Sequence, residues 1–210
     1  MEGFVGSSSG KILVGGYDIK TCTRDARESI GYCPQDNILF DELTVEEHVM
    51  FFAIVKGIPR DRARNEVVTV LYDSGLADHR SKKVMDLSLG LQRCLCTVMA
   101  IVGTPKVIIL DEPTANVDPD ARRDLWEMLM KLRRGCSVFL TTQHLDEAGV
   151  LGDRIAVMSS GRIRCVGSPA FLKQRFGTGY HLVVNKLPEV RYCEGQKISA
   201  EACPQDKAPK

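Results

Sequence analysis

A short apolar segment that ends in two carboxylates constrains the fold of this chain more than any other feature. Residues 107–110 (Val-Ile-Ile-Leu) form a continuous run rich in branched side chains, typical of a parallel strand that is buried on both faces. Asp111 and Glu112 follow directly, at the end of a strand where α/β sheets place their ligands. One such acid can hold a hydrated Mg²⁺ while the next acts as a base toward water. A strand that ends in a solvated acidic turn has the same pattern, so this segment alone does not decide between the two.

Composition and charge exclude several broad classes of protein. Of 210 residues, 28 are Lys or Arg and 27 are Asp or Glu, so the formal net charge of +1 gives no general attraction to nucleic acid or to an anionic membrane. Apolar runs such as residues 98–102 are far shorter than the roughly 18 residues of a membrane-spanning helix. No secretory signal pattern opens the chain, and the eight cysteines are irregularly spaced. We therefore expect a soluble, cytosol-side domain with no transmembrane segment and with reduced thiols, rather than a disulfide scaffold or a zinc site.

Strand-like and helix-like patterns alternate along the chain, which predicts an α/β layered fold. Thr44 and Glu47 have the capping-box spacing that opens a helix, and Asp61 is expected to cap a second helix that runs to about residue 72. Asp118 precedes a proline, the pattern of a cap and a first helical residue. The other expected elements are a short strand at 11–14, fully buried strands at 106–110 and 136–141, a helix over 92–102 behind Ser88, a helix from 119 to about 134, and a hairpin of 155–158 with 163–166.

Three further segments carry polar side chains that could bind phosphate or metal. His144 follows the strand expected at residues 136–141, and an imidazole there could contact a γ-phosphate and sense its loss. Gln35 lies in a loop where its amide could coordinate a metal or a water. Ser88 and Gly90 lie at a helix start, where free N–H groups and the helix dipole favour a phosphate. Taken singly, each has an ordinary structural explanation: a structural histidine, a loop glutamine and a serine N-cap.

The order of these segments resembles the nucleotide-binding domain of ABC transporters. The resemblance implies a P-loop (RecA-like) ABC ATPase domain with a helical signature subdomain, and ATP and Mg²⁺ as cofactors. Asp111 then binds Mg²⁺, Glu112 is the catalytic base and His144 is the catalytic switch histidine. Gln35 is the Q-loop residue, in contact with the metal and the nucleotide. The other nucleotide-binding residues that the resemblance implies are three in the signature motif and one in the D-loop: Ser88, Gly90, Gln92 and Asp118.

Finer features resemble the A subfamily of these transporters, large proteins that move lipids. They are the segments 29–40 and 43–48 around Gln35, and the segment 168–180 near the C-terminal end. The resemblance covers roughly residues 9–180. The expected parts are an unassigned leader at 1–8, the nucleotide-binding domain at 9–168, an A-subfamily extension at 169–187 and a disordered tail at 188–210.

One required part of such a domain is missing from the sequence. The phosphate loop, GxxxxGK[ST], cradles the β- and γ-phosphates with backbone donors and a lysine. Gly10 and Lys11 are the nearest match, but Val5 stands where the first glycine belongs and Ile12 stands where a hydroxyl would bind Mg²⁺. Residues 9–19 instead resemble the strand and turn that follow the phosphate-loop helix in this family. We therefore expect an incomplete P-loop ABC ATPase domain, truncated at its N-terminal side and without the loop, its strand and its helix.

The missing loop predicts weak nucleotide binding by this chain alone. Losing three charge-assisted hydrogen bonds of ~1.5 kcal/mol each weakens binding by roughly a thousandfold. We expect the chain alone neither to bind ATP tightly nor to hydrolyse it. We also expect marginal stability, because a missing strand and helix leave cavities and open sheet edges. Leu89 stands where the signature motif has its first glycine, and its side chain is expected to crowd the γ-phosphate of a partner's nucleotide.

Three functions are compatible with the sequence. The chain can be a piece of an A-subfamily transporter whose intact domain hydrolyses ATP at the cytoplasmic face of a membrane, with transmembrane domains and a second nucleotide-binding domain as partners and lipid as cargo. It can be a natural non-catalytic short form that docks on another nucleotide-binding domain. It can be a soluble ABC ATPase of DNA repair or translation. The A-subfamily segments and the lack of a basic patch favour the first function over the third, with no nucleic-acid partner.

Overall fold

The computed structural model describes residues 6–132 and 135–177. Residues 1–5 of the leader, Arg133 and Arg134, the last part of the expected extension and the tail expected at 188–210 lie outside the described residues. The strands are β1 (Leu13–Val14), β2 (Tyr17–Asp18), β3 (Ile30–Cys33), β4 (Val107–Asp111), β5 (Ser137–Thr141), β6 (Ile155–Ser159) and β7 (Arg162–Gly167). The helices are α1 (Thr23–Glu28), α2 (Val45–Val55), α3 (Arg60–Asp73), α4 (Leu89–Ile101), α5 (Pro119–Leu132), α6 (Leu145–Leu151) and α7 (Pro169–Phe176).

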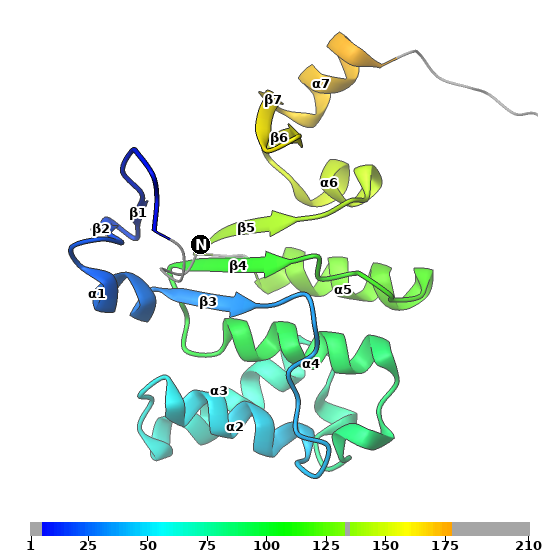
Figure 1. Ribbon diagram of the computed structural model, residues 1–210. Coiled ribbons are helices and arrows are strands. Elements are labelled where there is room, and N and C mark those ends of the chain that lie inside the picture. The colour runs from blue at the N-terminus through cyan, green and yellow to red at the C-terminus, as the bar shows by residue number, and fades with distance from the viewer. Residues whose placement is uncertain (1–5, 133–134, 178–210) are drawn as a thin grey trace, which may run out of the picture.

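Three parallel strands in the order β3-β4-β5 form the centre of the fold, which confirms the α/β expectation. Their arrows run in one direction in Figure 1, so their carboxyl ends meet at one edge of the sheet. Helix α4 packs against β3 and β4, and α2 packs against α4 and α3. Cys33, Leu110 and Leu140 are paired across the strands, and Cys33 and Leu110 are fully buried within the core.

A glycine allows α4 to approach β3 closely. A Cβ on Gly31 would collide with the backbone carbonyl of Ala100, near the C-terminal end of α4. Only a residue without a side chain permits this separation, because the colliding group is backbone and cannot rotate away. Gly31 therefore fixes how closely the helical layer lies against the sheet that carries the carboxylates.

Predicted caps are present at three helix starts. Thr44 and Glu47 form the reciprocal capping box of α2. Ser88 caps α4, where its Oγ accepts a backbone N–H three residues on at 3.3 Å. Asp118 caps α5 in the same way, at 3.0 Å. Each side chain satisfies an N–H group that the helix itself leaves free, so these residues determine where the three helices begin.

The helix start predicted at Asp61 is wrong. Helix α3 begins at Arg60, with Pro59 at the N-cap position and no side-chain cap bond. Pro59 has a φ of −58°, which its ring fixes, and it directs the chain into the helix without a polar cap. Asp61 lies in the first turn, where its negative charge faces the positive end of the helix dipole.

The prediction that β4 and β5 are buried on both faces is also wrong. Val107 and Ile109 of β4 are only half-buried. On β5, Val138 is 38% exposed and Phe139 is 56% exposed. Strand β5 lies at the edge of the described sheet, so no strand among the described residues pairs with its outer side. An apolar sequence therefore does not by itself show burial, because burial depends on what the rest of the chain supplies.

One face of the sheet carries a row of apolar side chains. Tyr32, Ile109 and Phe139 are paired in register across β3, β4 and β5, and they alternate with the buried residues on the α4 side. Tyr32 is 39% exposed and Ile109 is half-buried. Among residues 6–132 and 135–177, this face of the sheet is therefore partly open and β5 has no strand partner on its outer side.

The outer elements are small. The predicted hairpin is confirmed as β6 paired with β7, while β1 and β2 form a second short hairpin. Strand β3 and helices α1, α6 and α7 were not predicted, because each is short and carries too few periodic apolar residues. Among residues 6–132 and 135–177, no helix combines the length and the apolar character needed to cross a membrane.

The six described cysteines are free thiols. Burial raises the pKa of Cys94 and of Cys96 to about 12, so both stay protonated at neutral pH. Cys94 Sγ lies 3.3 Å from the sulfur of Met128, inside the packed layer between α4 and α5. These thiols act as small apolar core groups rather than as nucleophiles.

We expect the isolated chain to melt with a midpoint at or below ~45 °C, the lower end for ordinary domains, and to aggregate as it unfolds. Thermal melts by circular dichroism, recorded with light scattering, measure both. Phe139→Thr should slow aggregation without lowering the midpoint, because the side chain is already exposed. Val55→Thr, at an exposed position on α2, is the matched control and should change aggregation less. A sharp, reversible transition well above this temperature contradicts the expectation.

Candidate functional site

The neighbouring strand holds both carboxylates at the carboxyl end of β4. Thr141, the last residue of β5, donates its hydroxyl to Asp111 Oδ1. The Glu112 N–H donates to the carbonyl and to the hydroxyl of Thr141, both at 3.1 Å. Glu112 has a φ of +43°, in the left-handed region that residues with side chains rarely adopt. The bonds to Thr141 maintain this turn, which sends the two consecutive carboxylates in different directions.

Two amide side chains hold the Glu112 carboxylate from opposite sides of the site. Gln35 Nε2 donates to Glu112 Oε2 at 3.0 Å. Gln143 Nε2 donates to Glu112 Oε1 at 2.7 Å. Gln35 follows β3 and Gln143 follows β5, so the two amides reach Glu112 from the strands on either side of β4. The structure therefore brings Gln35 and Glu112 into contact, and Gln143 is a third member that was not predicted.

These side chains line a cavity of about 270 Å³ at the carboxyl end of the sheet. His144 is among the lining residues and also occupies the N-cap position of α6. Its backbone N–H donates to Thr142 Oγ1 at 3.0 Å, which fixes the turn between β5 and α6. The full lining is Gln35, Glu112, Thr114, Ala115, Asn116, Thr142, Gln143 and His144. The direct contact with Glu112 is made by Gln143, one residue before the predicted histidine.

The oxygen atoms of this cavity suit the magnesium ion of a magnesium–nucleotide complex, but the lining does not suit the phosphates. Mg²⁺ prefers oxygen ligands and is bound by one or two carboxylates together with substrate phosphates. Glu112 supplies a carboxylate of the lining, and Gln35 supplies an amide whose nitrogen already faces Glu112. Asp111 is not among the lining residues, and its carboxylate accepts from the Thr141 hydroxyl at the end of β4. The lining residues include no lysine or arginine, so they provide no cationic cradle for phosphates. Within the described ranges, no cluster of three or more His, Cys, Asp or Glu could hold a metal ion without other ligands.

The predicted signature and D-loop residues form a second cluster away from this cavity. Ser88 and Asp118 cap α4 and α5, whose first turns lie against each other. A Cβ on Gly90 would be 2.7 Å from the Cβ of Ala121 and 3.9 Å from Asp118 Oδ2. Glycine is therefore required at position 90 for the two helix starts to meet. None of these residues lines the cavity, so the structure separates the predicted site into two surfaces.

Two residues of the signature segment, Gln92 and Leu89, have surroundings that a simple nucleotide-binding role does not explain. Gln92 Nε2 donates to the carbonyls of Val84 and Leu87, both at 3.2 Å, so its amide nitrogen holds the preceding loop. Leu89 is 63% exposed at the first turn of α4. An apolar side chain thus occupies the surface where the family resemblance implies contact with a partner's nucleotide.

Arg93 connects the segments that build the cavity. Its side chain is buried, with 2% exposure, and it donates to five oxygen atoms. Four are backbone carbonyls at 2.7–3.1 Å, and the fifth is Asn37 Oδ1 at 3.3 Å. The carbonyls belong to Pro34, Asp111, Glu112 and Pro113. Since a guanidinium has five N–H donors, every donor of Arg93 is used.

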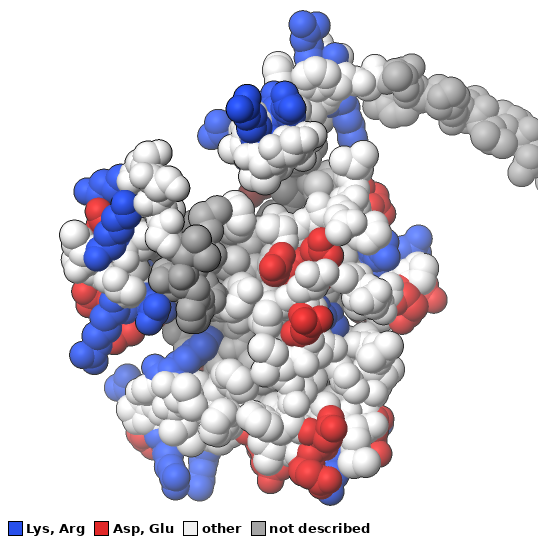
Figure 2. All heavy atoms as spheres, viewed as in Figure 1, with Lys and Arg blue, Asp and Glu red and all other residues white. Residues whose placement is uncertain are grey.

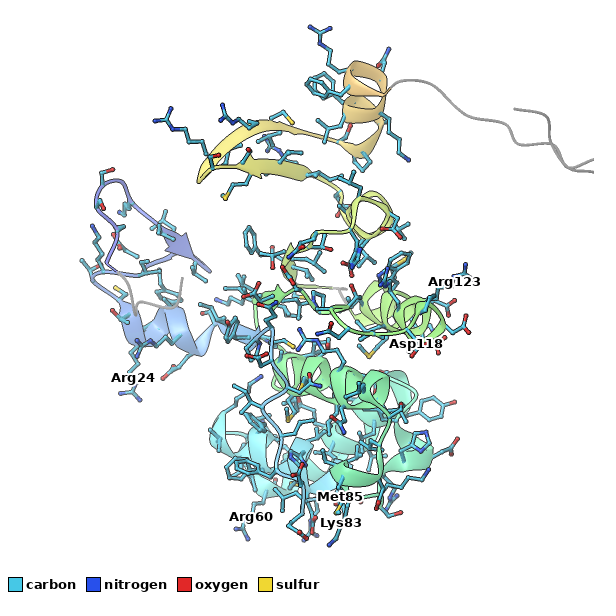
Figure 3. All side chains as sticks on the ribbon, turned by 45° about the vertical axis from the view of Figure 1, so that its right-hand side comes forward. Arg24, Arg60, Lys83, Met85, Asp118 and Arg123 are labelled. Atoms are coloured by element: carbon cyan, nitrogen blue, oxygen red, sulfur yellow. The ribbon has the colours of Figure 1, made fainter. Side chains whose placement is uncertain are left out.

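Charge is unevenly distributed around this part of the molecule. Figure 2 shows a largely uncharged centre with a few acidic side chains, while Lys and Arg gather mainly at the edges of this face. Figure 3 shows Asp118 just before α5 and Arg123 on this helix, with the Arg123 side chain directed away from the other elements. Arg123 is therefore a suitable control for substitutions of the buried Arg93.

Replacing Arg93 should destabilise the fold strongly. Arg93→Met removes a donor from five oxygens, and we expect the free energy of unfolding to fall by about 3 kcal/mol or more. Arg93→Lys should lose less, because an ammonium group offers three donors. Arg123→Met should change the free energy of unfolding by less than about 0.5 kcal/mol. Urea unfolding followed by circular dichroism measures all three, and equal effects of Arg93→Met and Arg123→Met would refute the role of Arg93.

A family comparison adds information that the geometry alone does not give. The family model described as "ABC transporter" matches residues 1–115, more than half of the chain. The matched segment ends just beyond Asp111 and Glu112, so it includes the strand that carries both carboxylates.

Curated relatives point to one branch of that family. The bovine protein named retinal-specific phospholipid-transporting ATPase ABCA4 is 49% identical over 196 residues, which cover 93% of this chain. The human phospholipid-transporting ATPase ABCA7 is 45% identical over 186 residues, or 89% of the chain. The human ATP-binding cassette sub-family A member 2 is 44% identical over 188 residues, or 90% of the chain. The chain spans only 8–9% of the length of these relatives.

Solved structures share the fold. One is cbiO1 from Clostridium perfringens, described as part of the ABC transporter complex cbiONQ, with 31% identity and a TM-score of 0.74. Another is an ATP-binding subunit of an ABC transporter, with 25% identity and a TM-score of 0.70. The match covers 84% of this chain in each case, and 72% and 74% of the two neighbours. More than a quarter of each neighbour therefore has no counterpart in the match.

Proposed function

We propose that this chain, which belongs to the ABC transporter family and is an A-subfamily ATP-binding domain, supplies the carboxylates of an ATP-hydrolysing site. In this proposal, ATP hydrolysis at the site drives lipid transport. The observation that carries this proposal is the convergence of Gln35, Glu112 and Gln143 at the carboxyl end of the parallel sheet. A carboxylate fixed by two amides and facing a polar cavity has the geometry of a general base held ready for a water molecule.

The carboxylates, amides and histidine at the carboxyl end of the sheet each have a proposed task. Asp111 binds Mg²⁺, and Gln35 shares the metal while its amide nitrogen orients Glu112. Glu112 takes a proton from the attacking water. When bound, Mg²⁺ stabilises the negative charge that develops on the phosphates. His144 contacts the γ-phosphate and responds to its loss, and Gln143 keeps the Glu112 carboxylate in place.

The second cluster has a proposed partner. Ser88, Gly90, Gln92 and Asp118 face the nucleotide of a second nucleotide-binding domain across a head-to-tail dimer. The transporter's membrane domains hold residues 9–168 at the cytoplasmic face of a membrane, with residues 169–187 as the subfamily extension. Lipid is the proposed cargo, because two of the relatives are named phospholipid-transporting ATPases.

The test of this proposal uses the native protein that carries this chain, purified from its membrane. We expect it to hydrolyse ATP and Glu112→Gln to lower kcat by roughly 100-fold or more, because the substitution removes the base. ATP binding should persist, since Gln keeps the size of Glu and one acceptor oxygen for a neighbouring amide. Glu127→Gln, at an exposed position on α5, is the control and should leave kcat unchanged. Equal rates for wild type and Glu112→Gln would overturn the role of Glu112.

A second function is favoured by a specific feature of the sequence, the lack of a GxxxxGK[ST] phosphate loop. A chain of this length would then act as a non-catalytic partner that offers Ser88–Gln92 and Asp118 to another nucleotide-binding domain. An antibody raised against residues 191–210 distinguishes the two functions. A membrane-bound species several times larger than 23.3 kDa supports the transporter, whereas a stable species of 23.3 kDa supports the non-catalytic partner.

A further inference from the structure

A buried carboxylate behind the cavity has no role in the proposed reaction. Glu147 lies on α6 and has 0% exposure, although it is ionisable. Each of its oxygens accepts one hydrogen bond. Thr114 Oγ1 donates to Glu147 Oε2 at 3.0 Å, and Trp126 Nε1 donates to Glu147 Oε1 at 3.1 Å.

The Thr114 bond reaches the turn that carries the candidate base. Thr114 is 1% exposed and lies two residues after Glu112, and it also lines the cavity. Within the same turn, the Ala115 N–H donates to the carbonyl of Glu112 at 3.0 Å. A bond from Glu147 to Thr114 therefore restrains the backbone on which Glu112 is strained.

Helix α6 carries this restraint to the other wall of the cavity. His144 occupies the N-cap position, and its carbonyl accepts the Ala148 N–H at 3.2 Å. Glu147 lies within this first turn, so a fixed Glu147 side chain also fixes the backbone at Gln143 and His144. The two polar walls of the cavity, residues 114–116 and 142–144, are thus joined through one carboxylate.

Trp126 ties the same carboxylate to a third element. It lies on α5, whose first turn is capped by Asp118 of the second cluster. Trp126 is the single tryptophan of the chain, so its fluorescence reports on this contact without labelling. Two acceptor oxygens on one side chain are needed to join three elements in this way, which an apolar residue of the same volume cannot do.

We propose that Glu147 is a positioning residue of the candidate site, which sets the distance between the Glu112 turn and the Gln143–His144 wall. Its link to catalysis rests on the proposed ATPase function, but the positional claim is independent of that function. The alternative is that Glu147 is a buried polar group that contributes only to global stability. The positioning role and the stabilising role differ in which segments loosen when Glu147 is replaced.

The first experiment uses the 210-residue chain and the variants Glu147→Leu, Glu147→Gln and Glu127→Gln. In Glu147→Leu we expect a shift of Trp126 emission and roughly tenfold faster amide hydrogen exchange in residues 112–117 and 141–151, with α2 and α3 unchanged. Glu147→Gln should restore most of the protection, because its oxygen can accept from Trp126 and its nitrogen can donate to the Thr114 hydroxyl. Glu127→Gln, an exposed position on the same helix as Trp126, should match the wild type.

Thr114→Val and Trp126→Phe keep the proposal testable if Glu147→Leu does not fold. Each removes one donor and should loosen one of the two connections, with Thr114→Val acting on residues 112–117. Unchanged exchange at 112–117 and 141–151 in these variants overturns the proposal. Exchange that rises equally in α2 and α3 also overturns it, because it shows a purely global effect.

The catalytic link is measured separately in the native protein. Glu147→Leu should lower kcat by about 10- to 100-fold with KM for ATP within about twofold of wild type, because it displaces the base without removing a nucleotide contact. A wild-type protein without ATPase activity refutes the proposed function and leaves the exchange result standing. An active wild type with an unchanged kcat in Glu147→Leu refutes the positioning role.

Discussion

The buried guanidinium of Arg93 is the interaction on which the candidate site depends. It follows the signature segment on α4 and donates to backbone carbonyls on both the Gln35 side and the Glu112 side of the cavity. The partners of Arg93 are carbonyl oxygens and not a neutralising carboxylate. The stabilisation that Arg93 provides therefore comes from the number and geometry of its hydrogen bonds. The position of the α4 start, which faces a proposed partner, is thereby linked to the position of the base.

A site residue could be predicted from the sequence only where a polar or charged side chain follows a strand that the sequence itself indicates. Asp111, Glu112 and His144 follow apolar strands that the sequence predicts, and parallel strands bring such positions to one edge, so their closeness was predictable. Gln35 follows β3, which was not predicted, and only the family resemblance pointed to it. Arg93, Gln143 and Glu147 were missed, because their contacts join segments from 18 to 59 residues apart. Gln143 alone carried a signal, its place beside His144 at a strand end.

The errors in the predicted fold have one physical origin. The apolar sequence of β5 is suited to a buried strand, but Val138 and Phe139 are exposed, because burial requires neighbours that the described residues do not supply. The same reasoning explains the one-sided cavity. Carboxylates and amides for a metal are present, whereas the lining offers no cation or glycine loop for phosphates. The open sheet face and the absence of a cationic side chain from the cavity lining are thus both features of the described residues.

The central claim is that this chain holds the metal side of a nucleotide site without its phosphate side. Isothermal titration of the purified 210-residue chain with MgATP tests it most directly, with Glu112→Gln as a comparison. The account predicts a Kd weaker than roughly 1 mM for both proteins, because the strongest phosphate contacts are missing. A micromolar Kd for the wild-type chain would contradict the account and would show that another part of the chain binds the phosphates.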